Sequence, residues 1–318
     1  MSKLRVAVIG CGYLGKFHAE KYAAMADVSL VGVADVNEAA AKAVAQRLGT
    51  TAYTDYRPLL QAVDAVSIVV PTGDHCRIGL DFLKNNVDVM MEKPMTATLE
   101  EADRLIELAE KNQRLIQVGH LERFNPAVHP VKSMVKEPLF IESHRLSIYK
   151  ERGTDVSVVL DLMIHDIDII LNFVKSEIVD IRAAGLSIIS GQVDIANARL
   201  EFASGCVANI TASRVSNRSE RKLRLFQKDA YISLDFGNSA ITVVGRSRNG
   251  SGSGPIPGME SRQLAFEKWD ALEQELKSFV ACVRDRVPPE VSGHEGRKAL
   301  QTALAVMDQI KRHEKRFT

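Results

Sequence analysis

The chain has 318 residues, of which 46% are hydrophobic and 25% are charged, and its formal net charge is +1. This length favours two domains, and the balanced charge excludes the strongly basic composition that polyanionic partners such as nucleic acids select. The four cysteines are scattered without a Cys-x-x-Cys pair, no signal peptide is visible, and no apolar run is long enough to span a bilayer. We therefore expect a cytoplasmic protein with no structural metal and no membrane insertion.

The first part of the chain alternates predicted strands with predicted helices. The strands are expected at 4–9, 29–34, 64–70, 87–91 and 115–118, and the helices at 16 onward, 38–48, 78–84 and 98–111. Thr98 and Glu101 form a capping box at the start of the last helix. This alternation is typical of an α/β fold with a doubly wound parallel sheet. We predict a dinucleotide-binding Rossmann domain over residues 1–120.

The turn after the first predicted strand carries Gly10, Gly12 and Gly15 in the spacing Gly-x-Gly-x-x-Gly. In this pattern the first glycine permits the tight turn, the second lets a pyrophosphate approach, and the third lets the helix pack closely. The helix N-terminus then offers free N–H groups to the phosphates. Asp35 follows the second strand, where its carboxylate can bind both ribose hydroxyls and repel a 2′-phosphate. The sequence predicts NAD binding, with NADP disfavoured, at a turn that includes Tyr13 and Leu14.

The pattern changes after residue 120, and we predict an α+β domain for substrate binding and oligomerisation over 121–318. Helices are expected at 125–135, 161–174, 266–284 and 293–316, and strands at 140–148, 181–189, 194–201, 206–213, 222–227, 230–235 and 240–244. Turn residues between these strands indicate an open, mostly antiparallel sheet. The Gly/Ser stretch 245–258 is interpreted as an exposed hairpin tip, with a lid as the alternative.

One face of this second sheet is expected to carry helices, and the other to be partly apolar. Ile210, Leu223, Leu225 and Ile232 are the candidates for that second face. Because a large apolar face does not stay in water, we expect a homo-oligomer joined sheet to sheet.

Ligands of open parallel sheets bind at the carboxyl ends of the strands. The polar segments that fall there, and that we expect to line the cofactor, are Pro71, Thr72, His75, Glu92, Lys93 and His120. Lys93 stands directly before Pro94, and its ammonium group could hydrogen-bond a substrate hydroxyl and lower the pKa of that hydroxyl. The alternative is a surface lysine at a turn.

Asp161 and His165 are four residues apart, so they share one face of a predicted helix whose surroundings are apolar. Charged groups in such a segment are costly unless they have a partner. His165 could take a hydroxyl proton as hydride leaves the same carbon, while Asp161 stabilises the imidazolium or binds a sugar. The alternative is a core histidine, and Asp166 and Asp168 are interpreted as structural or helix-exposed. Metal ligation by Asp161, His165 and His144 is disfavoured, because no second histidine sits at the i+4 spacing and no cysteine pair supports it.

Together these motifs resemble the glucose–fructose oxidoreductase/inositol dehydrogenase (Gfo/Idh/MocA) family over nearly the whole chain. The matching segments are Gly10-x-Gly12-x-x-Gly15, Pro71-Thr72-x-x-His75, Glu92-Lys93-Pro94, Gly119-His120-x-x-Arg123-Phe124-Asn125-Pro126 and Asp161-Leu162-Met163-Ile164-His165-Asp166-Ile167-Asp168. In this family Lys93, Asp161 and His165 would match the catalytic lysine, aspartate and histidine. The resemblance implies a sugar, cyclitol or nucleotide-sugar substrate and a dimer or tetramer. The chain departs from the family at 154–158, where a glycine-rich approach is common, and at Met163.

The stretch 152–165 is similar to that of bacterial UDP-N-acetylglucosamine 3-dehydrogenases. A diphosphate would suit the basic residues available, because arginine binds phosphate through parallel hydrogen bonds. The candidate substrate-binding residues, besides Asp161 and His165, are Arg123, Asn125, Arg145 and Arg152, with Lys150 and Arg214 also available. The alternative is ordinary surface charge.

We expect an NAD-dependent dehydrogenase that takes hydride from a secondary hydroxyl of a sugar or nucleotide sugar. Two other functions occur on this fold and stay open: a glycosidase that uses bound NAD for a transient oxidation, and a non-catalytic NAD-binding regulator. Net NADH production separates a dehydrogenase from a glycosidase.

Overall fold

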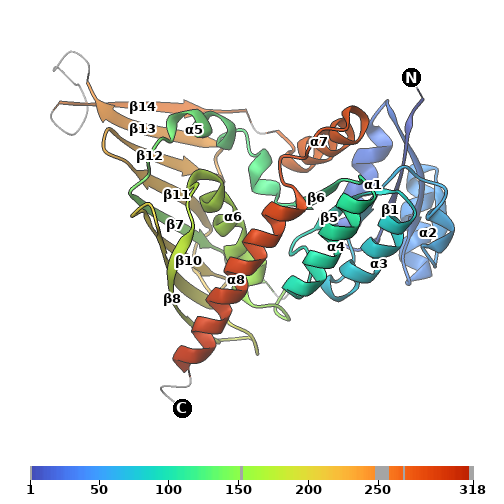
Figure 1. Cartoon of the computed structure of the whole chain (residues 1–318), viewed down its shortest axis with the longest axis horizontal. Helices are drawn as coiled ribbons and strands as arrows, with labels where there is room; N and C mark the ends of the chain where they lie inside the picture. The colour runs from blue at the N-terminus through green and yellow to red at the C-terminus, as the bar shows by residue number, and fades with distance from the viewer. Residues whose placement is uncertain (1, 151–152, 248–257, 268, 315–318) are drawn as a thin grey trace. The chain divides into compact units, whose positions relative to one another are not determined.

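The computed structural model describes residues 2–150, 153–247, 258–267 and 269–314, and the chain divides into two compact units (Figure 1). One unit contains Met1–Leu121 and Asp270–Leu300, and the other contains Glu122–Trp269 and Gln301–Thr318. The segment Asp270–Leu300 lies within the predicted C-terminal domain, but in the structure it clusters with the N-terminal unit. No helix among the described residues is long and apolar enough to cross a membrane.

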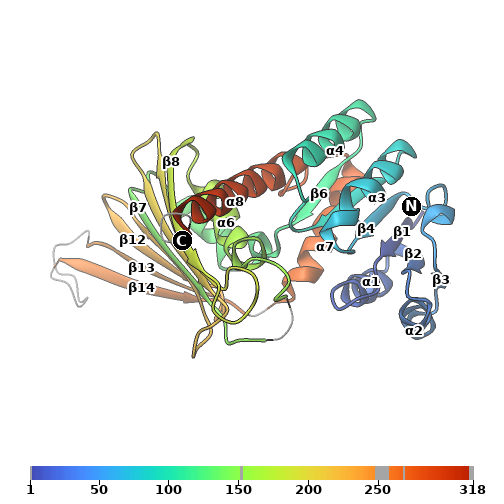
Figure 2. The ribbon, with the colours of Figure 1, turned by 90° about the horizontal axis from the view of Figure 1, so that it is seen from below.

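The N-terminal unit contains a six-stranded, all-parallel sheet with strand order β3-β2-β1-β4-β5-β6. Its strands are β1 (Leu4–Ile9), β2 (Val28–Ala34), β3 (Thr51–Tyr53), β4 (Ala65–Ile68), β5 (Asp88–Glu92) and β6 (Ile116–Gly119). The helices α1 (Gly15–Ala24) and α2 (Glu38–Leu48) cover one face, and α3 (Thr72–Lys84) and α4 (Leu99–Lys111) cover the other (Figure 2). The predicted doubly wound α/β sheet is confirmed, and β3 is an edge strand that the sequence analysis did not predict.

Local signals in the sequence mark several helix ends in this unit. Gly49 adopts a left-handed φ of 65° after α2, which ends that helix. At the start of α4, the Thr98 side chain accepts from the backbone N–H of Glu101, and the Glu101 carboxylate accepts in return from Thr98 N–H. This is the predicted capping box.

Helix α7 (Ala271–Asp285) joins the N-terminal unit through its apolar face. Leu276, Phe279 and Val280 belong to the same buried cluster as Val6 and Tyr22 of β1 and α1. This burial explains why a segment distant in sequence clusters with the first domain. Helix α8 (Gly293–Glu314) follows.

The C-terminal unit contains an eight-stranded sheet with order β14-β13-β12-β11-β7-β10-β9-β8. The strands are β7 (Phe140–Leu146), β8 (Ile178–Leu186), β9 (Ile195–Phe202), β10 (Val207–Ser213), β11 (Glu220–Phe226), β12 (Ala230–Asp235), β13 (Ala240–Arg246) and β14 (Met259–Ala265). Only β7 and β10 pair in parallel, so the sheet is mostly antiparallel as predicted. The predicted Gly/Ser loop separates β13 from the unpredicted β14, and its residues 248–257 lie outside the described residues.

The helical elements of this part are η2 (Leu121–Phe124), α5 (Val128–Met134), the π-helical turn η3 (Val159–Met163) and α6 (Ile164–Phe173). Helix α6 packs on β7 and β10. We call the sheet face that α6 covers the inner face and the opposite one the outer face.

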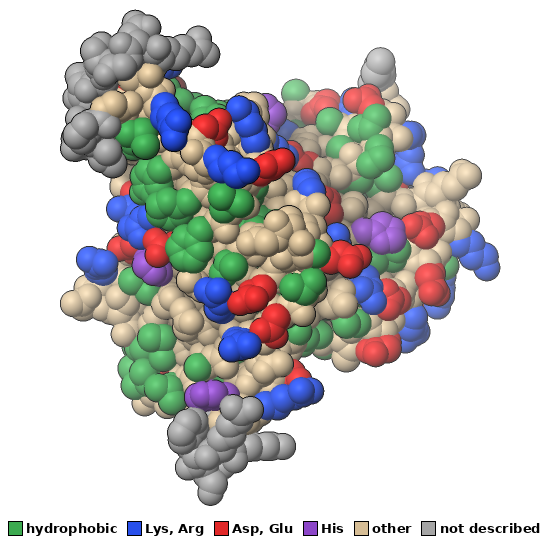
Figure 3. Space-filling model, turned by 60° about the vertical axis from the view of Figure 1, so that its left-hand side comes forward, with side chains coloured by type: hydrophobic (Ala, Val, Ile, Leu, Met, Phe, Trp, Pro, Cys, Tyr) green, Lys and Arg blue, Asp and Glu red, His purple; other side chains and the backbone are tan. Residues whose placement is uncertain are grey.

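The four apolar residues expected on the open face lie on the inner face instead. Ile210 and Leu223 stand opposite Ser143, and Leu225 stands opposite Ile141 and Ile232. Ile141, Ser143 and Arg145 occupy every second position of β7, so they lie on the same face of the sheet. The guanidinium of Arg145 contacts Asp166 of α6, so this face is the inner one, and the residues opposite share it. Ile210, Leu223, Leu225 and Ile232 are fully buried. Hydrophobic residues do cover part of the exposed surface shown in Figure 3, but they alternate there with charged residues.

Candidate functional site

The glycine turn between β1 and α1 is shaped by three different requirements. Gly10 has a left-handed φ of 97°, and a Cβ there would collide with the carbonyl oxygen of Val69. A Cβ on Gly15 would collide with the carbonyl oxygen of Gly10, whereas a Cβ on Gly12 would meet no protein atom within 4 Å. Gly10 and Gly15 are therefore needed by the protein's own backbone, while Gly12 leaves free space next to the helix N-terminus.

Asp35 follows β2 and lies beside this turn. One of its carboxylate oxygens accepts from the backbone N–H of Cys11 at 2.7 Å, and the other accepts from that of Asn37 at 2.8 Å. Burial, and then the charge of Asp35, raise the pKa of the Cys11 thiol to about 12. Each carboxylate oxygen retains a lone pair that a ribose hydroxyl can use. The free space at Gly12 and this fixed carboxylate fit a dinucleotide.

Pro71 and Thr72 form the N-terminus of α3, at the carboxyl end of β4. His120 directly follows β6 and is 1% exposed. These three residues thus follow carboxyl ends of the parallel strands, on the edge where ligands of such sheets bind.

His75, expected at the cofactor, is only 1% exposed and has three backbone carbonyl oxygens as neighbours. Its Nε2 is 2.9 Å from Val70 O, and its Nδ1 is 3.1 Å from Pro94 O and 3.3 Å from Met95 O. Burial lowers the pKa of His75, while the neighbouring carbonyl oxygens and the charge of Glu92 oppose this shift. His75 therefore ties the end of β4 to the turn after Lys93, and its ring offers almost no surface to a cofactor.

Glu92 ends β5, and its carboxylate binds the backbone of Lys93. Oε2 accepts from the backbone N–H of Lys93 at 3.1 Å, and Oε1 is 3.2 Å from Nε2 of His18. Burial alone would raise the pKa of Glu92, but its hydrogen bond and electrostatic interaction with His18, together with the charge of Lys93, hold this pKa below its usual range. The half-buried Lys93 thus leaves the strand end beside an ionised carboxylate.

His18 was not among the predicted site residues. Gly15, His18, Ala19 and Tyr22 are the buried residues of α1, at the spacing of one helix face. A histidine and a tyrosine on the inward face of the helix after a Gly-x-Gly-x-x-Gly turn are the signal that could have identified this group.

Asp161 and His165 lie where η3 meets α6. Short π-helical turns are rare and are often found at functional sites. Both side chains are half-buried, whereas Ile164 and Asp166 beside them are buried. His165 is therefore not a fully buried core histidine.

The segment before η3 lies against Asp161 and is held by Arg214. A Cβ on Gly153 would be 3.3 Å from the Asp161 carboxylate. Arg214 donates to the carbonyl oxygens of Gly153 and Val156, so its guanidinium is engaged by the chain itself.

Arg123 and Arg145, expected to bind a diphosphate, are buried against carboxylates. Arg123 donates from Nε and Nη2 to Asp168 at 2.6 and 2.8 Å. Arg145 donates in the same way to Asp166 at 3.0 and 2.8 Å, and its Nη1 donates to Glu122 at 2.7 Å. Burial alone would lower the pKa of Arg145, but the carboxylates of Asp166 and Glu122 raise it above its ordinary value. The two arginines fasten α6 within its unit, and Asp166 and Asp168 are structural rather than helix-exposed.

The remaining predicted substrate residues are Asn125 and Arg152. Asn125 is buried, its Nδ2 donates to the carbonyl oxygen of Phe236 at 3.2 Å, and its Oδ1 accepts from Ala127 N–H at 3.1 Å. Asn125 thus stabilises a turn, and Arg152 lies outside the described residues.

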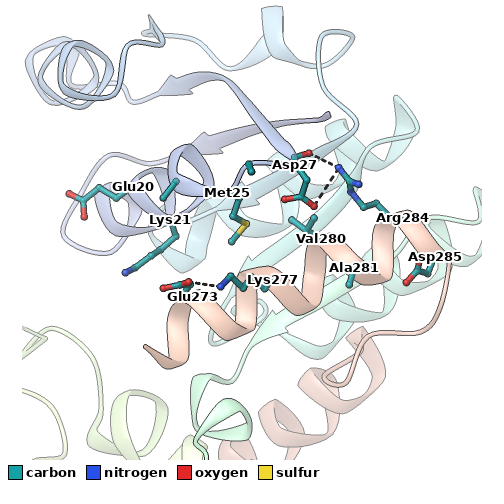
Figure 4. Close-up of a pocket in the computed structure, with 12 residues that line it drawn as sticks. Glu20, Lys21, Met25, Asp27, Glu273, Lys277, Val280, Ala281, Arg284 and Asp285 are labelled. Carbon is teal, nitrogen blue, oxygen red and sulfur yellow. Dashed lines mark hydrogen bonds and ion pairs between the residues drawn. The ribbon is translucent and has the colours of Figure 1, made fainter. Parts of the chain in front are cut away.

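A cavity of about 620 Å³ lies between α1 and α7 (Figure 4). Four of its charged residues form ion pairs across or along its wall, Lys277 with Glu273 and Arg284 with Asp27. Asp27 directly precedes β2, so this cavity lies at the amino ends of the strands. A second cavity of about 380 Å³ is lined by residues at the starts of β1, β4 and β5, on the same edge. Both lie opposite the edge where ligands of parallel sheets bind.

Comparison with known families gives two matches. Residues 4–120 match a family described as "Oxidoreductase family, NAD-binding Rossmann fold". Residues 131–245 match a family described as "GFO/IDH/MocA C-terminal domain".

Comparison with individual proteins agrees with these matches. A UDP-N-acetylglucosamine 3-dehydrogenase from Acidithiobacillus ferrooxidans is 38% identical over 96% of this chain and 97% of its own length. A myo-inositol 2-dehydrogenase from Thermotoga maritima is 28% identical, with 95% of each chain covered. A solved structure of the Acidithiobacillus enzyme superposes with a TM-score of 0.93 over 98% of this chain and 99% of that one.

Proposed function

This chain belongs to the Gfo/Idh/MocA family of NAD-binding oxidoreductases, and from this premise we propose that it oxidises a secondary hydroxyl of a nucleotide sugar, namely C3 of UDP-N-acetylglucosamine. The observation that carries the proposal is the similarity of the whole chain, at 38% identity, to an enzyme named for that activity.

The residues of the N-terminal unit fit NAD. The helix N-terminus of α1 and the free space at Gly12 would hold the pyrophosphate, and Asp35 would accept from the ribose hydroxyls. When bound, NAD supplies the hydride acceptor. The chain itself then has to orient the sugar and remove one proton.

We propose three residues for this chemistry. His165 takes the proton of the reacting hydroxyl, which a neutral imidazole can do near neutral pH. Lys93 donates a hydrogen bond to the same oxygen and stabilises the negative charge that develops there. Asp161 supports His165 as it becomes positively charged, or binds the sugar. The partial exposure of Asp161 and His165 at the junction of η3 and α6 supports these roles.

The diphosphate of the substrate would be bound by residues other than Arg123 and Arg145. Their donors face Asp168, Asp166 and Glu122 inside the unit. Moving either guanidinium to a phosphate would leave a buried carboxylate uncompensated, which is costly. Lys150 is exposed, and it remains a candidate for binding the diphosphate.

A screen of NAD reduction tests the proposal. Purified protein is incubated with NAD and with UDP-sugars, free hexoses or inositols, and NADH is followed at its absorbance band. We expect UDP-N-acetylglucosamine to give the largest kcat/KM. A larger kcat/KM for an inositol would contradict the proposed substrate and indicate an inositol dehydrogenase, as the Thermotoga relative is named. Hydrolysis of the sugar without net NADH production would indicate a glycosidase.

We further propose that the protein works in the cytoplasm as a homodimer or homotetramer. The outer face of the C-terminal sheet supports this assembly, because Phe140, Phe226 and Tyr231 form a row of neighbouring aromatic rings on it.

A further inference from the structure

Four polar side chains form a continuous chain inside the N-terminal unit and end at Lys93. The Tyr22 hydroxyl is 2.9 Å from Ser67 Oγ, which is 3.3 Å from Nδ1 of His18. Nε2 of His18 is 3.2 Å from the carboxylate of Glu92, which accepts from the backbone N–H of Lys93. Tyr22, His18 and Ser67 are fully buried.

The donors of this chain can all be directed toward Glu92. If Tyr22 donates to Ser67 and Ser67 donates to Nδ1 of His18, the proton of His18 sits on Nε2 and points at the carboxylate. Tyr22, Ser67 and His18 then each donate once, and the carboxylate of Glu92 accepts. A buried network satisfied in this way is rigid, because losing any link leaves a polar group without a partner.

The Glu92 carboxylate has little room to move. Its atoms lie 3.1 to 3.2 Å from where a Cβ of Gly119 would be, so the carboxylate packs directly on the backbone of β6. On its other sides it is bound by His18 and by the backbone of Lys93. The position of the Lys93 backbone therefore depends on where this carboxylate is held.

Stability alone does not call for polar groups at these positions. A sheet covered by a helix can be stabilised by apolar side chains, and replacing a buried ionic pair by well-packed apolar residues is often neutral or stabilising. Hydrogen bonds along a chain of four polar groups fix the orientation of each side chain, and the last bond fixes the position of one backbone N–H.

We propose that His18 is a positioning residue for hydride transfer, which acts through Glu92 to hold Lys93 in place. The proposal rests on the role given to Lys93 in the proposed function. His18 lies in the first turn of α1, the helix whose N-terminus would receive the pyrophosphate. The helix α1 would thus bind the dinucleotide and also hold Lys93, which acts beside the nicotinamide end of that dinucleotide.

Two substitutions of similar polarity test the contact of His18 with Glu92 separately from its contact with Ser67. The amide nitrogen of His18→Gln reaches about as far as Nε2 and can still donate to Glu92. The amide of His18→Asn reaches only about as far as Nδ1, so it can meet Ser67 but not Glu92. Both variants place an amide in the same buried space, which matches them for desolvation and size better than an apolar replacement would.

The first readout does not depend on activity. In protein labelled with 15N-lysine, the hydrogen exchange rate of the Lys93 amide reports its bond to Glu92. We expect exchange in His18→Asn to be faster than in His18→Gln by about tenfold, with the amide of Lys84 in α3 as an internal control for global opening.

The second readout is kinetic. We expect kcat of His18→Asn to fall about ten- to a hundredfold below the parent, with KM for the sugar and the Kd of NAD within about threefold. His18→Gln should retain a kcat about tenfold above that of His18→Asn.

The outcomes distinguish this proposal from the function it rests on. If His18→Asn and His18→Gln share the same kcat, the positioning role is overturned, whatever the Lys93 amide shows. If Lys93→Met transfers hydride at the parent rate, the role of Lys93 itself fails, while the amide comparison still reports whether His18 holds the segment. If His18→Asn does not fold, Glu92→Gln takes its place, because this variant keeps the shape of the side chain and removes its charge. We then expect Glu92→Gln to lower kcat about ten- to a hundredfold and to speed exchange of the Lys93 amide. If it does neither, the proposal is wrong.

Discussion

At the scale of single residues, the glycine turn offers a matched pair of substitutions. A Cβ at Gly12 meets no protein atom within 4 Å, so Gly12→Ala should leave the free energy of unfolding within about 1 kcal/mol of the parent. It should nevertheless weaken NAD binding, because the methyl group occupies the space of the pyrophosphate. Gly15→Ala collides with the Gly10 carbonyl and should destabilise the fold instead. Calorimetric titration of NAD and urea unfolding of both variants check this, and equal NAD affinity in Gly12→Ala and the parent would contradict it.

A second prediction concerns Asp35 and the choice between NAD and NADP. Its carboxylate is fixed beside the glycine turn by Cys11 and Asn37, so a 2′-phosphate would meet its negative charge at close range. We expect NAD to bind more tightly than NADP, and Asp35→Ser to narrow the difference. Titration with both cofactors measures this, and tighter binding of NADP to the parent would refute the assignment.

A third prediction concerns the proposed general base, His165. A general base contributes about a hundred- to ten-thousandfold in rate, so His165→Ala should lower single-turnover hydride transfer by about that factor while NAD affinity stays close to the parent. A substitution of His75 serves as the comparison. Because His75 is buried against three carbonyl oxygens, its loss should lower the stability of the protein and disturb the turn after Lys93. If loss of His75 abolishes transfer and loss of His165 changes it only a few-fold, the roles are reversed.

At the scale of elements, the turn between β8 and β9 depends on one buried carboxylate. Asp194 accepts from the hydroxyl of Ser190 and from the backbone N–H groups of Ile188, Ile189 and Ser190. Burial alone would raise the pKa of Asp194, but these donors hold it well below its usual value. Because the folded-state pKa is depressed, the stabilisation is complete above the unfolded value of about 4 and is lost as pH falls below it.

Asp194→Asn should therefore lower the free energy of unfolding at pH 7 and reduce its loss on acidification to pH 3. Urea unfolding of parent and variant at the two pH values measures the difference. An unchanged acid dependence in the variant would show that other carboxylates are responsible.

At the scale of the whole molecule, the outer face of the C-terminal sheet is the surface on which we expect copies to join. Phe226 lies between Phe140 and Tyr231, with ring centroids 5.8 and 5.0 Å away. Phe226→Glu would place a charge in the middle of this row and should shift sedimentation toward the monomer. Val179→Glu, at an exposed position of β8, is the control that should not. A parent protein that sediments only as a monomer at micromolar concentration would rule out the assembly.

Features that depend on neighbouring residues could be predicted from the amino-acid sequence alone. The strand β1, the helix α2 and the capping box of α4 follow from local periodicity and hydrogen bonds within one turn. The Gly10, Gly12 and Gly15 spacing and the Gfo/Idh/MocA resemblance likewise needed no tertiary contacts. The alternation of strands and helices was enough for the parallel sheet, because right-handed crossovers leave few alternatives.

Contacts between groups that are distant in the sequence became known only from the fold. An arginine in the sequence looks equally suited to a phosphate and to a carboxylate, and it is the fold that brings Asp168 to Arg123 and Asp166 to Arg145. The packing of α6 on β7 and β10 decided that Ile210 and Leu223 lie on the covered face, since the alternation along a strand gives two faces but not which one is covered. The link from His18 to Glu92 spans 74 residues, and the apolar face of α7 is covered by residues of α1 and β1. Such contacts depend on burial and packing between segments that are remote in sequence, which no local pattern encodes.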